Sequence, residues 1–216
     1  MAAATIKVMP FGASIVEGGC WRAYLQKSLK ESGTSNFDFV GGQSGPTECK
    51  LNNVVVDFDK NNEGHSGAKA QEFVANSNLI GWLKAATPQI IMMHLGTNDV
   101  KANRKTEEII GDYSVLLSQM RAQNANVQLL VMKLIPLRTA GNDAAWVAAI
   151  PKLNDAIANW AKDNTKTTSP ITVVDMFTGF NADTMTTDGT HPNEEGNKLM
   201  SSRLSQPLKD AIKARG

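Results

Sequence analysis

The sequence has few of the residues that coordinate metal ions. Only three of its 216 residues are histidine and two are cysteine. Their spacing matches no zinc-binding motif, and the acidic residues form no EF-hand loop. We therefore expect neither a metal centre nor any other bound cofactor.

The sequence also lacks an excess of charge and a long hydrophobic run. Lysine and arginine together number 22 and aspartate and glutamate 21, which leaves a formal net charge of +1. Without a basic patch, neither nucleic acid nor an anionic membrane is an expected partner, whereas a neutral polymer such as a polysaccharide is compatible. No apolar stretch approaches the roughly 20 residues that span a bilayer.

Residues 1–5 contain no charged region followed by a long apolar region, so they do not have the pattern of a signal peptide. Two interpretations remain open: the protein is cytosolic, or it is exported and a starting methionine has replaced its signal peptide. Cys20 and Cys49 are compatible with both, as reduced thiols in the first case or as a disulfide in the second.

Short apolar runs alternate with longer segments of helical periodicity. The apolar runs occupy residues 6–9, 37–40, 89–95, 127–132 and 171–175, and the helical patterns residues 21–29, 73–84, 106–123, 144–162 and the segment from 194 onward. This alternation predicts βαβ units. We expect a single domain over residues 1–216, folded as a three-layer α/β sandwich with a central five-stranded parallel sheet. The polar stretch 43–67 is expected to be a long functional loop, and Pro151 to kink or divide its helix.

In such a fold, sites lie at the carboxyl ends of the strands. The first run is followed by residues 10–13 and then by Ser14, where a hydroxyl can be exposed in a sharp turn whose backbone N–H groups can hold an anion. The glycine-rich segment 12–19 is equally compatible with a phosphate-binding or a purely structural turn. The third run is followed by Asn98, whose amide could donate to an oxyanion, although Asn98 and Asp99 could instead cap the next helix.

An acid–histidine pair stands near the C-terminus. Asp188 precedes His191 by three residues, in a turn that Pro192 stiffens. At this spacing the carboxylate can reach the imidazole Nδ1–H, fix its tautomer and stabilise the imidazolium that forms when the ring accepts a proton from a serine. The alternative is a polar histidine on the surface.

Three segments together resemble one known family. Residues 12–15 are similar to the GDS block of SGNH/GDSL hydrolases, residues 96–99 to their GxND block and residues 188–192 to their DxxHP block, in the family's order. Four further segments are similar to carbohydrate esterase family three, the microbial acetylxylan esterases: residues 9–12, 20–25, 39–41 and 63–67. The resemblance implies a flavodoxin-like SGNH hydrolase fold.

The resemblance also implies a role for each matching residue. Ser14 would attack the acyl carbon, His191 would act first as base and then as acid, and Asp188 would orient His191. The family is exported, which favours a disulfide between Cys20 and Cys49 and a secreted protein.

The oxyanion hole implied by the resemblance consists of the backbone N–H groups of Ser14 and Gly67 and the side chain of Asn98, with Gly64 as an alternative to Gly67. One position departs from the family, which has aspartate where this chain has Ala13. That carboxylate commonly braces the oxyanion loop, so its loss could misplace the loop, and small geometric errors can lower the rate about a hundredfold. A weakened enzyme, a compensated natural variant and an engineered mutant are all compatible with Ala13.

Three residues next to these blocks have less specific interpretations. His65 and Thr97 are candidates for contact with the substrate, and a structural role for His65 is also compatible. His94 lies inside an apolar run and is expected to be a core histidine whose hydrogen bonds are satisfied.

The expected function is that of a secreted, monomeric serine esterase that removes O-acetyl groups from plant cell-wall polysaccharide such as acetylxylan through an acyl-enzyme. Three alternatives remain. The first is a lysophospholipase or thioesterase of the same superfamily. The second is a flavodoxin-like module that binds phosphate or flavin on residues 12–19. The third is a carbohydrate-binding protein inactivated through Ala13.

Overall fold

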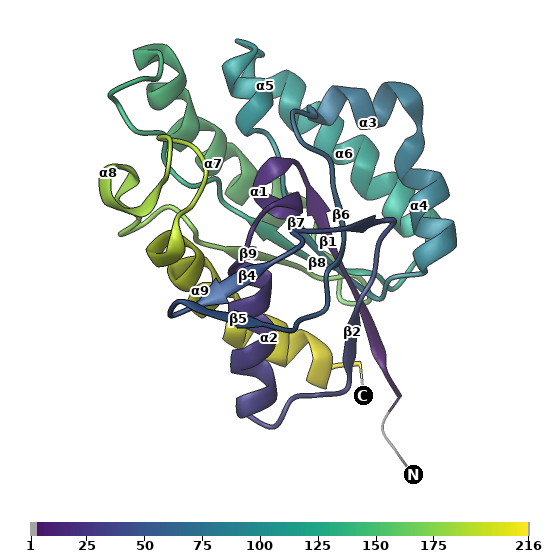
Figure 1. Cartoon of the computed structure of the whole chain (residues 1–216). Helices are drawn as coiled ribbons and strands as arrows, with labels where there is room; N and C mark the ends of the chain where they lie inside the picture. Colours follow the sequence, from purple (N-terminus) through teal and green to yellow (C-terminus); the bar gives the residue numbers. More distant parts are fainter. Residues whose placement is uncertain (1–3, 216) are drawn as a thin grey trace.

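The computed structural model describes residues 4–215 and contains a central, mostly parallel β-sheet (Figure 1). Its strands in chain order are β1 (Ile6–Gly12), β2 (Phe37–Phe39), β3 (Gln43–Ser44), β6 (Asn61–Gly64), β7 (Ile90–His94), β8 (Gln128–Met132) and β9 (Ile171–Val174). In space the order is β3-β6-β1-β7-β8-β9, and β2 also pairs with β1. Because β2 pairs with the start of β1 and β6 with its end, these two strands share one edge of β1.

Helices cover both faces of the sheet (Figure 1). One face carries α2 (Trp21–Glu31) and α9 (Glu194–Lys213), and the other carries α3 (Ala70–Asn76), α4 (Asn78–Ala86), α6 (Thr106–Gln123) and α7 (Ala144–Asn164). Three short helices complete the chain: α1 (Ser14–Glu17), α5 (Thr97–Lys101) and α8 (Ala182–Met185). The fold is therefore the expected three-layer α/β sandwich.

The sheet separates two apolar cores. Along β1, Met9 and Phe11 pack on the side of α3, α4, α6 and α7, whereas Ile6 and Val8 pack on the side of α2 and α9. Every residue of β7 and β8 is buried, as expected for strands covered on both faces. Burial of these runs is the main reason that the segments identified by their apolar character form strands.

The sheet is larger than the expected five strands. The stretch 43–67, expected to be a loop, contributes β6 parallel to β1, β3 antiparallel to β6, and a separate hairpin of β4 (Cys49–Leu51) and β5 (Val54–Val56). The four residues of β6 include Asn62 and Glu63, which are buried and hydrogen-bonded instead of apolar. A strand of this composition has no hydrophobic periodicity and therefore no signal in the sequence.

Two helices also differ from expectation. The pattern over residues 73–84 forms two helices, because Ser77 adopts a left-handed conformation with φ of 53° and ends α3. Pro151 does not divide its helix, since α7 runs through it as one element. None of the helices within residues 4–215 is both long and apolar enough to cross a bilayer.

A disulfide joins Cys20, just before α2, to Cys49 in β4. Cys49 packs in a small third core with Ala23, Leu51 and Phe58. The bond therefore attaches the β4–β5 hairpin to the face of the molecule that carries α2 (Figure 1).

Candidate active site

The carboxyl edge of the sheet brings together two segments that lie far apart in the sequence. Ser14 is the first residue of α1, two positions after the end of β1, and its Oγ lies 2.9 Å from Nε2 of His191, 177 positions further along the chain. Nδ1 of His191 lies 2.7 Å from Oδ2 of Asp188. The N-terminal ends of α2 and α9 are held together by the hydrogen bond from the Trp21 backbone N–H to Oδ1 of Asn197, 3.0 Å long. The packing of these helices therefore fixes the histidine turn beside the serine.

The turn that carries the histidine is held by Asp188 itself. Its Oδ1 accepts hydrogen bonds from the backbone N–H groups of Thr190, at 2.9 Å, and His191, at 2.8 Å. Gly189 has a φ of 91°, a conformation that favours glycine. Burial opposes ionisation of Asp188, but the hydrogen bonds from the backbone and ring of His191 and from Thr190 outweigh it and hold the pKa of Asp188 well below its usual value. The carboxylate is thus ionised when it faces the imidazole.

Three N–H donors are available near the serine. Within residues 4–215, the backbone N–H groups of Ser14 and Gly67 have no hydrogen-bond partner. The side-chain amide of Asn98 uses one N–H to donate to the Ala68 carbonyl, at 3.0 Å, which leaves its second N–H for a ligand. The Gly64 N–H, by contrast, donates to Oδ1 of Asn62 at 2.8 Å. This difference favours Gly67 over Gly64 as an oxyanion donor.

The loop that contains Gly67 is anchored from two sides. On one side, Oε2 of Glu17 accepts the backbone N–H of Ser66 at 2.7 Å. On the other, the buried carboxylate of Asp99 accepts the backbone N–H of Ala70 at 3.0 and 3.1 Å. The sequence did not predict that Glu17 and Asp99 hold this loop. For Glu17 a local signal was present, because it lies three residues after Ser14 and therefore on the same side of a helix.

Asp99 is itself supported by a cation. Nη1 of Arg104 lies 2.8 Å from Oδ1 of Asp99. Burial raises the pKa of Asp99, and the hydrogen bonds from Arg104 and Ala70 partly offset that rise. Asp99 was interpreted from the sequence only as a helix-capping candidate, because its partner Ala70 lies 29 positions away.

Ala13 lies in a buried, apolar position. Its side chain is 9% exposed and packs with the core that contains Phe11 and Leu95. Ala13 is the N-cap of α1, and no side chain caps that helix. The loop that contains Gly67 is held instead by Glu17 and Asp99, neither of which is at position 13.

The other two histidines have hydrogen-bonding environments that differ from that of His191. Nε2–H of His65 donates to Oε1 of the buried Glu63 at 2.8 Å, and the His65 ring stacks on Trp82 with ring centroids 4.2 Å apart. His94 is buried, as expected, but its Nε2 has no hydrogen-bond partner within residues 4–215, so the expectation of a satisfied histidine was wrong. Burial lowers the pKa of His94 to about 4.

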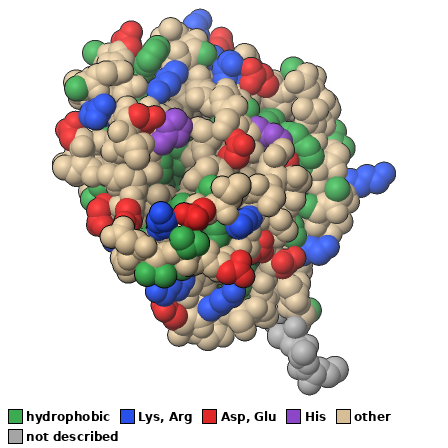
Figure 2. Space-filling model, viewed as in Figure 1, with side chains coloured by type: hydrophobic (Ala, Val, Ile, Leu, Met, Phe, Trp, Pro, Cys, Tyr) green, Lys and Arg blue, Asp and Glu red, His purple; other side chains and the backbone are tan. Residues whose placement is uncertain are grey.

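Two hollows meet at Ser14. The larger is a cleft of about 460 Å³ whose wall includes Ser14, His191, Glu17, Ser44, Thr47 and Ser66. The smaller is a pocket of about 10 Å³ whose wall includes Ser14, Asn98, Thr190 and Thr97, which is buried. The wall of the cleft, as far as described residues form it, contains no lysine or arginine. Figure 2 shows this face of the molecule, where two histidine side chains lie on either side of a carboxylate.

This site contains a serine hydroxyl, an imidazole and a carboxylate that are hydrogen-bonded in series. Such a series at the carboxyl edge of a parallel sheet is typical of α/β serine hydrolases. Comparison with known proteins agrees with this class. The profile of the GDSL-like Lipase/Acylhydrolase family matches residues 11–199. A carbohydrate esterase family 3 structure from Talaromyces cellulolyticus is 34% identical, with a TM-score of 0.87, over 97% of this chain and 99% of that one.

Other relatives are also esterases. A crystallised mutant of an acetyl esterase with acetate ion is 33% identical over 98% of this chain and all 100% of the other, with a TM-score of 0.86. A family 3 carbohydrate esterase from Clostridium thermocellum is 27% identical over 98% and 100% of the two chains, with a TM-score of 0.79. A multidomain esterase from Ruminococcus flavefaciens is 28% identical over 230 residues, and the match spans 99% of this chain but only 30% of that protein.

The chain belongs to the GDSL-like lipase/acylhydrolase family and is similar to a carbohydrate esterase of family 3 over 97% of its length. It is therefore a hydrolase of the SGNH superfamily that acts on esters.

Proposed function

We propose that this chain is a serine esterase that removes O-acetyl groups from plant cell-wall polysaccharide such as acetylxylan through an acyl-enzyme. The observation that carries the proposal is the hydrogen-bonded series from Ser14 Oγ to His191 Nε2, at 2.9 Å, and from His191 Nδ1 to Asp188 Oδ2, at 2.7 Å. These distances permit proton transfer from the hydroxyl to the ring without rearrangement.

In the first half of the reaction, Ser14 Oγ attacks the acetyl carbon and His191 takes its proton. The ionised Asp188 stabilises the imidazolium and holds the ring in the required tautomer. The N–H groups of Ser14 and Gly67 and the free N–H of Asn98 receive the oxyanion. The loss of one such donor typically costs about 3–4 kcal/mol of transition-state stabilisation.

Collapse of the tetrahedral intermediate breaks the bond between the acyl carbon and the sugar oxygen. His191 returns its proton to that oxygen, which releases the polysaccharide hydroxyl and leaves acetyl-Ser14. In the second half, His191 deprotonates a water molecule that attacks the acetyl group, and collapse releases acetate and regenerates the Ser14 hydroxyl.

The two hollows at Ser14 support acetyl as the acyl group. The pocket of about 10 Å³ suits a small group such as a methyl, whereas the cleft of about 460 Å³ can receive a sugar ring. The proposal assigns the acyl group to the pocket and the alcohol to the cleft. A relative that is an acetyl esterase, crystallised with acetate, is consistent with this assignment.

The charge of the cleft argues against the alternative substrates. Lysophospholipids and coenzyme A thioesters carry phosphate groups, which proteins usually bind with lysine or arginine. The described wall of the cleft has neither, and it contains the carboxylate of Glu17. A neutral, hydroxyl-rich alcohol fits this wall better than an anionic one.

The disulfide supports a secreted protein, because such bonds persist mainly in oxidising compartments. We propose that the chain acts outside the cytosol and as a monomer; the series of Ser14, His191 and Asp188 needs no residue from a second chain.

The test measures acetate release from acetylated xylan and hydrolysis of p-nitrophenyl esters of increasing acyl length. The parent chain should prefer the acetyl ester, and Ser14→Ala should abolish turnover while the circular dichroism spectrum is unchanged. Asp188→Asn should lower kcat by about 10³–10⁴, because the ring loses its tautomer-fixing partner. Turnover by Ser14→Ala, or activity that rises towards the octanoyl ester, would contradict the proposal.

A variant at the unusual position tests whether the chain is weakened. Ala13→Asp is expected to change kcat/KM by less than about tenfold, because the oxyanion loop is already anchored by Glu17 and Asp99. A much larger gain in acetate release would mean that Ala13 limits the activity.

A further inference from the structure

We propose that Glu17 selects sugar esters in this cleft, through a hydrogen bond from a hydroxyl of the acetylated sugar ring to its carboxylate. The inference rests on the proposed esterase function and adds the residue that recognises the alcohol half of the ester. It concerns binding of the leaving group and not the chemistry at Ser14.

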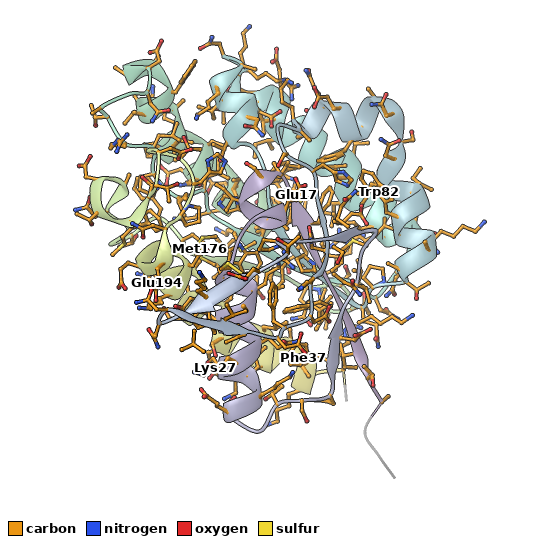
Figure 3. All side chains as sticks on the ribbon, in the orientation of Figure 1. Glu17, Lys27, Phe37, Trp82, Met176 and Glu194 are labelled. Atoms are coloured by element: carbon orange, nitrogen blue, oxygen red, sulfur yellow. A yellow bond between two sulfur atoms is a disulfide. The ribbon has the colours of Figure 1, made fainter. Side chains whose placement is uncertain are left out.

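The position of Glu17 is fixed by its helix. It is the last residue of α1, three residues after Ser14, and it lines the same cleft as Ser14 and His191. Its backbone N–H donates to the Ala13 carbonyl at 3.0 Å. Gly64 of β6 lies so close that an added methyl group would come within 2.3 Å of the Glu17 nitrogen. Figure 3 shows Glu17 on α1, apart from Trp82 on α4.

The carboxylate of Glu17 is oriented before any substrate binds. Its Oε2 accepts the backbone N–H of Ser66 at 2.7 Å, which holds the carboxyl plane. Its Oε1 has no hydrogen-bond partner within residues 4–215. A preoriented acceptor loses little side-chain entropy on binding, so more of the hydrogen-bond energy contributes to affinity.

The surroundings of Glu17 specify what it can bind. The neighbouring wall supplies the hydroxyls of Ser44 and Thr47, and the described wall contains no cation that would neutralise the carboxylate. An acceptor of full negative charge favours hydroxyl donors and repels phosphate and carboxylate groups. The leaving group that matches this wall is a neutral sugar with a hydroxyl close to the acetylated oxygen.

The experiment compares Glu17→Gln with the parent chain on two substrates, acetylated xylo-oligosaccharides and p-nitrophenyl acetate. Glutamine keeps an oxygen that can accept the Ser66 N–H, so the loop anchor is retained while the charge is lost. Hydrogen bonds to charged groups are roughly twice as strong as neutral ones. We expect the ratio of kcat/KM for the sugar ester to kcat/KM for p-nitrophenyl acetate to fall roughly tenfold, mainly through a higher KM for the sugar ester.

Glu31→Gln is the matched control. Glu31 is an exposed glutamate at the end of α2, so its replacement removes the same charge outside the cleft. Its ratio should equal that of the parent chain. An unchanged ratio in Glu17→Gln would overturn the inference, including the case in which both activities fall equally because Glu17 acts only through the loop. Ser14→Ala, measured in parallel, distinguishes this outcome from failure of the proposed function.

Discussion

The three histidines show how residues of one type acquire different properties from their surroundings. His191 lies at the cleft between Ser14 and Asp188, with 43% of its side chain exposed. His65 is held by the buried Glu63 and an aromatic ring. His94 lies in the core at the end of β7, where its Nε2 has no described partner. Only the first of these environments combines exposure with partners on both ring nitrogens.

The buried His94 predicts an acid-sensitive stability. Its pKa is about 4 in the folded protein and about 6.5 in the unfolded chain, so the unfolded state binds a proton more readily. The contribution of neutral His94 is complete above about pH 6.5 and is lost as the pH falls towards 4, which amounts to about 3 kcal/mol. Urea unfolding at a series of pH values should show this loss.

The variant His94→Gln separates this residue from other titrating groups. Between neutral pH and pH 4, its free energy of unfolding should fall by about 3 kcal/mol less than that of the parent chain, because glutamine does not titrate. Equal losses in the two proteins would assign the acid sensitivity to other residues.

At the scale of elements, the four-residue helix α1 depends on its neighbours. A helix this short has too few internal hydrogen bonds to be stable alone. It packs closely because glycine occupies the adjoining strands: a methyl group on Gly12 would come within 2.8 Å of Val16 Cγ2, and one on Gly64 within 2.3 Å of the Glu17 backbone nitrogen. The placement of both Ser14 and Glu17 therefore depends on these close approaches.

Gly64→Ala tests this dependence. The added methyl group must push α1 away from β6, so we expect a loss of about 1–3 kcal/mol in the free energy of unfolding together with a lower kcat on every ester. Gly111→Ala is the matched control: Gly111 lies within α6 with nothing near its Cβ position, and alanine should stabilise the protein by about 0.5–1 kcal/mol. Chemical denaturation measures both, and a neutral Gly64→Ala would show that α1 can shift without cost.

At the scale of the whole molecule, the cleft is assembled from distant parts of the chain. Its lining includes residues 44–47, which precede the β4–β5 hairpin, and His191, which lies three positions before α9. The Cys20–Cys49 disulfide attaches the hairpin to the body of the protein and closes a loop with a sequence separation of 29. Few hydrophobic residues hold that region otherwise.

Replacement of both cysteines by serine should therefore lower the free energy of unfolding by about 3–4 kcal/mol, the loop-closure entropy of a loop of this length. Denaturation with and without a reducing agent measures the change. The reductant should destabilise the parent chain and leave the double variant unaffected. Equal stability of the oxidised parent and the variant would show that the hairpin is held by its packing alone.

Most regular elements follow from local features of the sequence. The helix over residues 106–123 and the strand β7 were predicted within a residue or two, because helical periodicity and continuous apolar runs are properties of neighbouring residues. The polar strand β6 was missed, since its burial is compensated by hydrogen bonds that no local pattern reveals. The break at Ser77 was missed for a similar reason: a single left-handed residue leaves no periodic signal.

The candidate site divides in the same way. Ser14, Asn98 and the Asp188–His191 pair could be identified because each belongs to a short motif. Glu17 could not, because its partner Ser66 lies 49 positions away.

The sequence by itself determined the α/β alternation, the family and the groups available for catalysis, since these depend on periodicity and on motifs of a few residues. Only the tertiary structure decided that Ser14 meets His191 across 177 positions, that Glu17 lines the same cleft, and that Nε2 of the buried His94 has no described hydrogen-bond partner. These properties depend on burial and on hydrogen bonds between distant segments, which exist only after the chain has folded.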